Sequence, residues 1–168
     1  MIHYTFYQKN PASHYVYIDM VIKKRAGQPL TLQLPAWRPG RYELGNFAKN
    51  IKRVDVFDKQ GQPLKFTKSS KDCWHVEAEN ETEVKVTYSY YAAELNAGAC
   101  FADVHQIYIN PIHCCMYHLE QQEIEHRILL QIPENYKVAC SLKREGKELI
   151  ASNYDELVDS PFIASAQL

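Results

Sequence analysis

The chain has 168 residues, enough for one domain that buries about 70% of the surface its unfolded form exposes. Its 19 Lys and Arg residues nearly balance 20 Asp and Glu residues, so no broad basic face indicates binding to nucleic acid or anionic lipid. No apolar run reaches the roughly 18 residues of a membrane-spanning helix. Residues 1–7 lack the basic start and apolar core of a signal peptide, so a cytoplasmic location is expected.

The cysteine pattern argues against a secreted disulfide framework. The count of five is odd, and Cys114 directly precedes Cys115. Neighbouring cysteines close a disulfide only with strain, so we expect reduced, buried thiols.

Short segments with alternating apolar residues recur along the chain and are separated by turn residues. Residues 92–102 form the longest predicted loop, and residues 42–50 and 154–158 each favour a short helical turn. No segment is long enough for the helix of a βαβ crossover. The pattern therefore predicts an all-β fold, an antiparallel β-sandwich of about ten short strands. The segments with strand character are 2–7, 14–22, 30–34, 51–57, 64–66, 73–76, 82–91, 104–110, 114–117, 124–132, 138–142 and 148–150.

The segment LPAWRPGRY at residues 34–42 predicts a rigid corner after a strand. Pro35 stops the strand ladder because it has no N–H, and Trp37 is expected to cover an apolar surface. A direct ligand contact from Trp37, Arg38 or Tyr42 is the alternative. The residues expected to hold the corner, in which Pro-Gly forms a turn, are Trp37, Pro39, Gly40 and Tyr42.

Three segments, in order along the chain, resemble the glycyl aminopeptidase family. LPAWRPGRY at 34–42 looks like the family's opening signature. IPENYKVA at 132–139 is similar to its Leu-Pro-x-Gly-Trp strand, with Asn-Tyr in place of Gly-Trp. YDELVDSP at 154–161 resembles the junction Tyr-Asp-Glu-Leu-x-Asp-Ser-Pro. The resemblance implies a zinc metallopeptidase with an amino-terminal β domain, a thermolysin-like catalytic domain and often a PDZ domain.

The resemblance covers only the non-catalytic part of that plan. A thermolysin-like site needs H-E-x-x-H on one helix, and this motif is absent from the sequence. His118 and His126 lie eight residues apart, about 12 Å along a helix, too far to share one ion. We therefore expect no catalytic residue and no metal in this chain, and we expect zinc in a catalytic domain that the chain lacks.

A cluster of histidine and cysteine between residues 100 and 118 leaves a zinc site open. On a strand, His113 and Cys115 would share a face. However, no C-x-x-C pair occurs, and both residue types are common in cores, so a structural role is favoured. A nucleophilic cysteine is disfavoured because nothing marks a thiol with a lowered pKa. The members of the cluster are Cys100, His105, His113, Cys114, Cys115 and His118.

The resemblance also indicates which residues would border the substrate. Residues 103–110 match the edge that faces the catalytic cleft, where the amides of Gln106 and Asn110 could bond to a peptide. Glu94 takes the place of a frequently acidic family residue, although the alanine-rich sequence after it departs from the pattern. Ordinary loop polarity is the competing interpretation.

The sequence thus predicts a non-catalytic amino-terminal β domain that braces a catalytic metallopeptidase domain of the same parent chain and shapes the substrate entrance. It would meet peptide substrate only indirectly, and an apolar face left bare would promote self-association. The alternative is a free-standing binding module that uses its tyrosines and tryptophans for a carbohydrate or peptide.

Overall fold

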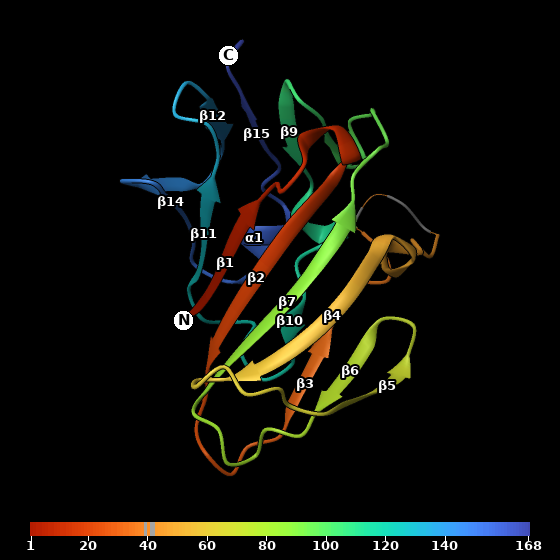
Figure 1. Cartoon of the computed structure of the whole chain (residues 1–168), viewed down its shortest axis with the longest axis vertical. Helices are drawn as coiled ribbons and strands as arrows, with labels where there is room; N and C mark the ends of the chain where they lie inside the picture. Colours follow the sequence, from red (N-terminus) through yellow and green to blue (C-terminus); the bar gives the residue numbers. More distant parts are fainter. Residues whose placement is uncertain (39, 41–42) are drawn as a thin grey trace.

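The computed structural model describes residues 1–38, 40 and 43–168, most of which lie in β-strands or in turns between them (Figure 1). The largest sheet has seven strands, and only its central pair β1 and β11 is parallel. Mostly antiparallel sheets confirm the predicted all-β class. In spatial order the strands are β13 (Lys143–Glu145), β14 (Glu148–Ala151), β11 (His126–Gln131), β1 (Ile2–Tyr7), β2 (Tyr15–Lys23), β7 (Glu83–Tyr91) and β4 (Ile51–Asp58).

Two four-stranded antiparallel sheets complete the fold, and side chains from all three sheets meet in one core. The first consists of β10 (Tyr117–His118), β3 (Leu30–Gln33), β6 (Cys73–Val76) and β5 (Phe66–Ser70). The second consists of β12 (Lys137–Cys140), β15 (Phe162–Ser165), β9 (Gln106–Ile109) and β8 (Phe101–Ala102).

Period-two alternation explains which face of the large sheet is buried. Successive side chains of a strand point to opposite faces, so every second residue of β2 and β7 enters the core. The alternation that predicts strands at 14–22 and 82–91 also places these side chains on one face of each strand. The buried residues are Val16, Ile18, Met20 and Ile22 on β2, and Val84, Val86, Tyr88 and Tyr90 on β7.

Helical structure is confined to short turns. The predicted turn at 154–158 is the helix α1 (Tyr154–Val158), and the predicted turn at 42–50 is reduced to the 3-10 turn η2 (Phe47–Asn50). Two further 3-10 turns, η1 (Pro11–Ser13) and η3 (Pro111–His113), each begin with a proline. Proline suits the first position of such a turn because its missing N–H has no partner there.

The predicted strand at 114–117 is wrong except for its last residue. Residues 114–116 run irregularly between η3 and β10, yet all three are fully buried. Their carbonyl groups accept hydrogen bonds from tyrosine hydroxyls in place of a neighbouring strand. The three bonds, each 2.7 Å, run from Tyr88 to the Cys114 carbonyl, from Tyr154 to Cys115 and from Tyr4 to Met116. We call residues 114–116 the tyrosine-held segment.

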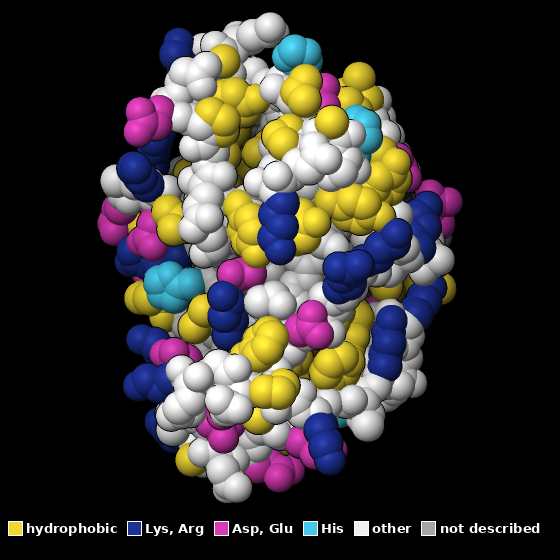
Figure 2. Space-filling view, viewed as in Figure 1, with side chains coloured by type: hydrophobic (Ala, Val, Ile, Leu, Met, Phe, Trp, Pro, Cys, Tyr) yellow, Lys and Arg dark blue, Asp and Glu magenta, His cyan; other side chains and the backbone are white. Residues whose placement is uncertain are grey.

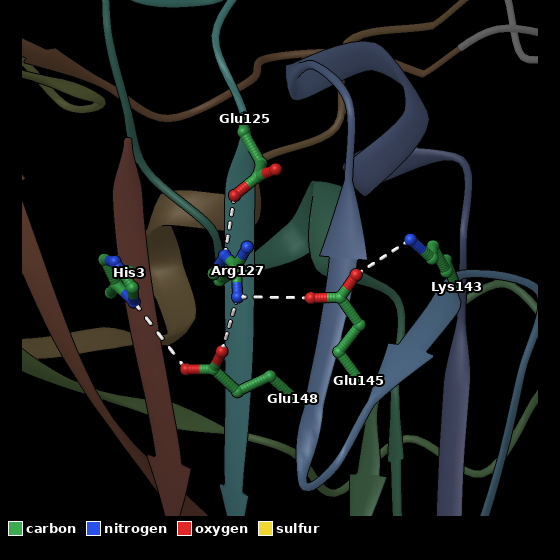
Figure 3. A network of polar contacts seen from close by, with 6 residues as sticks. All are labelled: His3, Glu125, Arg127, Lys143, Glu145 and Glu148. Atoms are coloured by element: carbon green, nitrogen blue, oxygen red, sulfur yellow. Dashed lines mark hydrogen bonds and ion pairs between the residues drawn. The ribbon is translucent and has the colours of Figure 1, made fainter.

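An exposed ion-pair network crosses the edge of the large sheet (Figure 3). Arg127 on β11 lies at its centre, with its guanidinium 2.6 Å from the Glu125 carboxylate and 2.9 Å from that of Glu148. These hydrogen bonds raise the pKa of Arg127 above its ordinary value. The network links β1, β11, β13 and β14, and its other members are His3, Lys143 and Glu145.

Candidate functional site

Two of the sequence segments that resemble the peptidase family lie on opposite sides of one groove. The groove has a volume of about 550 Å³. Residues 34–37 form one wall, and α1 forms the other through Tyr154, Asp155, Val158 and Asp159. The walls are separated by the 116 residues from 38 to 153, so the fold itself brings them together.

The wall formed by residues 34–37 begins where β3 ends. Leu34 is fully buried and anchors the segment, and the amide of Gly45 donates to the Ala36 carbonyl at 2.7 Å, which closes the loop. Gly40 has φ +83, which agrees with the predicted turn because glycine adopts positive φ without strain. Pro39 and Tyr42, the other two expected corner residues, lie outside the described residues.

Trp37 does not fill an interior. The residue is 57% exposed at the groove, so the described residues cover less than half of it. Leu44, at 76%, and Leu95, at 71%, are exposed on the same loop and on the neighbouring loop at 94–98. We call Trp37, Leu44 and Leu95 the apolar rim.

The second wall is set by the cap of α1. The Asn153 side chain accepts from the Glu156 amide at 2.8 Å, and the Glu156 carboxylate accepts from the Ser152 amide and hydroxyl at 2.6 Å. These bonds satisfy N–H groups that have no partner at the start of a helix. The two bonds from Ser152 also lower the pKa of Glu156. Tyr154, which also lines the groove, donates its hydroxyl to the Cys115 carbonyl at 2.7 Å.

A second hollow, of about 440 Å³, adjoins the apolar rim on the side of η2. Glu94 and Lys49 lie across it, 3.9 Å apart and each more than half exposed. At its base the ring of Phe47 stacks on His113 with ring centres 4.2 Å apart, and Nδ1 of His113 lies 3.4 Å from the Tyr90 hydroxyl.

Arg38 connects the corner to the loop at 94–98. Its guanidinium donates to the Gly98 carbonyl at 3.1 Å. A Cβ at Gly98 would lie 2.5 Å from the Arg38 guanidinium, so a larger residue at 98 would displace the end of this flexible side chain. The sequence pattern did not reveal this contact.

The fold does not bring together the three residues that were expected to border the substrate. Glu94 lines the second hollow. The Asn110 amide nitrogen donates to the Ala99 carbonyl at 2.5 Å, so it holds the loop, and a substrate would have to compete for it. Gln106 lies at the start of β9, about 13 Å along the strand from Asn110, beside Ser165 of β15.

Of the histidine and cysteine cluster, His105 is exposed, and the other members are buried. Among the described residues no three His, Cys, Asp or Glu side chains lie together as metal ligands would. All five cysteines are free, and burial raises the pKa of the Cys100 and Cys114 thiols. Their thiolates are disfavoured, which fits a structural role better than a nucleophilic one.

No helix in the described part of the chain is both long and apolar enough to cross a membrane. The short strands and turns described above account for most of the chain.

Residues 3–166 match the family model of the Peptidase M61 N-terminal domain. The fold is similar to that of an aminopeptidase N family protein from Idiomarina loihiensis, with a TM-score of 0.90 and 26% sequence identity. That similarity covers 98% of this chain but only 29% of the other protein. No curated protein matches the chain. The family match spans nearly the whole sequence and agrees with the resemblance of the three motifs; the chain belongs to the Peptidase M61 N-terminal domain family.

Proposed function

We propose that this domain is the non-catalytic amino-terminal part of a zinc-dependent, glycyl-aminopeptidase-like metallopeptidase, in which it braces the catalytic domain and shapes the substrate entrance. Two findings support the proposal. The matched family is a peptidase amino-terminal domain, and the chain spans 29% of the length of the similar solved protein. Zinc and hydrolysis would belong to the catalytic domain.

The observation that carries the proposal is the exposure of the apolar rim. Trp37, Leu44 and Leu95 are each more than half exposed. Trp37 lines the groove, and Leu44 and Leu95 are chain neighbours of Gly45 and Glu94, which line the second hollow. Clustered exposed apolar side chains mark surfaces that bind another protein or domain. Trp37 is the principal anchor, because tryptophan contributes strongly when it is buried at an interface.

The polar groups beside the rim suit a place at the substrate entrance. Glu94 and Lys49 are exposed and 3.9 Å apart, an arrangement that leaves both free to reorient toward a peptide. Exposed pairs of this kind contribute little to stability, so exchanging one partner for a substrate group costs little. We assign the entrance role to Glu94 and the holding of its loop to Asn110.

A cytoplasmic location completes the proposal. Its support is the set of five cysteines, all free, a state typical of a reducing compartment.

The reading frame provides a first test. It should continue past Leu168 into a helix with H-E-x-x-H, whereas a stop codon directly after Leu168 would favour the free-standing binding module.

The decisive test uses the parent enzyme with Trp37→Ala. Loss of a buried tryptophan anchor should lower kcat/KM on a glycyl amide by about fivefold or more with an unchanged zinc content. Leu119→Ala is the matched control, because Leu119 is 47% exposed and lines neither hollow. Equal activity of the two variants would refute the bracing role.

A further inference from the structure

The outer face of the seven-stranded sheet carries aromatic and basic side chains in a strip. Figure 2 shows hydrophobic side chains with Lys and Arg among them over this face, toward the upper ends of β2 and β7 in the view. Neither small sheet covers this face, since the core lies on the opposite side of the same strands.

Two tyrosine pairs form the apolar part of the strip. Tyr7 on β1 and Tyr17 on β2 stack with ring centres 5.5 Å apart, and Tyr15 on β2 contacts Tyr91 on β7 at 5.1 Å. Tyr15 and Tyr17 are alternate residues of one strand. The two pairs are therefore repeated at about 7 Å along β2.

A lysine ammonium lies over one ring of each tyrosine pair. The Lys9 ammonium lies 4.4 Å from the centre of the Tyr17 ring, and the Lys52 ammonium lies 5.2 Å from that of Tyr15. In the described part of the chain, neither lysine forms an ion pair with a carboxylate. Both charges remain available to a ligand.

Arg53 adds a third cation through an irregularity of β4. The pairing of β4 with β7 shifts between Lys52 and Asp55, and Arg53 has φ 52, an unusual conformation for a residue other than glycine. Such bulges redirect a side chain. Here Arg53 lines a hollow of about 320 Å³ together with Tyr7, Lys9 and Tyr17.

The nearby carboxylates do not cancel this charge. Asp19 accepts from the Tyr7 hydroxyl at 3.2 Å and pairs with Lys85 at 2.8 Å, so it is already neutralised. Asp55 borders the hollow opposite the two cations Lys9 and Arg53. The strip therefore keeps a positive excess although the chain as a whole has a formal charge of −1.

We propose that this strip binds an extended acidic peptide. An extended peptide presents side chains on one face about every 7 Å, which is the repeat of the tyrosine–lysine units. Carboxylates at alternate positions meet Lys9, Lys52 and Arg53, and the aliphatic parts of the peptide lie on the tyrosine rings.

The same features disfavour a single-stranded nucleic acid. Nucleic-acid platforms offer open aromatic faces for base stacking, whereas Tyr7 and Tyr17 stack on each other and Lys9 covers Tyr17.

The test measures fluorescence anisotropy of a labelled ten-residue peptide of alternating Glu and Ala added to the 168-residue chain at low salt. Lys9→Gln and Lys52→Gln should each weaken binding about threefold, and together about tenfold, because each removes one exposed ion pair. Lys137→Gln on β12 is the control and should bind like the original chain. Circular dichroism checks that each variant is folded.

Two further probes sharpen the result. A peptide of the same composition with its five Glu residues in one block should bind more weakly, because its charges lack the 7 Å repeat, and added salt should weaken both. Equal affinities of the Lys9→Gln, Lys52→Gln and Lys137→Gln variants, no binding of the alternating peptide, or tighter binding of a ten-residue oligothymidine would each overturn the proposal.

Discussion

The tyrosine-held segment and the apolar rim differ in whether the domain itself satisfies them. Residues 114–116 have no strand partner, yet three tyrosine hydroxyls satisfy their buried carbonyls from within the domain. The rim has the reverse arrangement: Trp37, Leu44 and Leu95 are large apolar side chains for which the described chain provides no cover. The first region is complete in itself, and the second is, in our proposal, covered by the catalytic domain.

The largest effect is expected from breaking the tyrosine-held segment. In Tyr88→Phe with Tyr154→Phe, two buried carbonyls lose their donors, and the free energy of unfolding should fall by about 3 kcal/mol. Urea denaturation measures this change. Tyr117→Phe is the control, because no hydrogen bond of its hydroxyl is found among the described residues. A loss no larger than that of the control would show that the hydroxyls are dispensable.

Acid should weaken the same interior. His126 is fully buried beside Tyr4 and Tyr154, and burial lowers its pKa to about 4. The unfolded chain has the ordinary pKa near 6.5 and binds the proton more readily, so this contribution is complete above pH 6.5 and is lost as the pH falls toward 4. Between pH 7 and pH 5 the loss should be about 2 kcal/mol.

A matched pair of variants isolates this titration. His126→Gln should flatten the dependence of unfolding free energy on pH in that window, and His75→Gln, at an exposed position on β6, should not. Parallel profiles for the two variants would rule out His126 as the cause.

The helix α1 belongs to both regions, because Tyr154 holds the Cys115 carbonyl while Asp155 and Val158 line the groove. Asn153→Ala removes its cap and should cost about 1 kcal/mol. Thermal unfolding measures the cost. Ser13→Ala at the exposed turn η1 is the control, and an equally small change in both would show that the cap does not secure α1.

The smallest effect on stability is expected at the rim. Trp37→Ser removes an exposed side chain and should leave the free energy of unfolding within about 0.5 kcal/mol of the original. It should instead reduce self-association of the isolated domain, measured by sedimentation at high concentration. A strictly monomeric original chain would contradict this use of the rim.

Sequence patterns predicted the parts of the fold that local periodicity determines. The strands β2 and β7 and the helical turn α1 follow from residues close together in the chain. The tyrosine-held segment could not be predicted in this way, because each of its hydrogen bonds joins residues at least 26 positions apart. The strands β13 and β15 also escaped prediction, since neither has a strong alternating pattern.

In the candidate site too, the sequence predicted local features and missed contacts between residues that are distant in the chain. The motifs at 34–42 and 154–161 were recognised as important, but their meeting across one groove is a property of the fold. Trp37 was expected to cover an apolar surface, and its 57% exposure could not be predicted because it depends on residues distant in the chain. The contact between Arg38 and Gly98 was not predicted, because the two residues lie 60 positions apart in the chain.

Hydrogen exchange of the apolar rim tests the central claim most directly. The backbone amides of residues 43–46 and 94–98 should exchange at least about tenfold more slowly in the parent peptidase than in the isolated domain, because the catalytic domain would cover them. The tyrosine-held segment should exchange at the same slow rate in both proteins. Equal exchange of the rim in the two proteins would contradict the account.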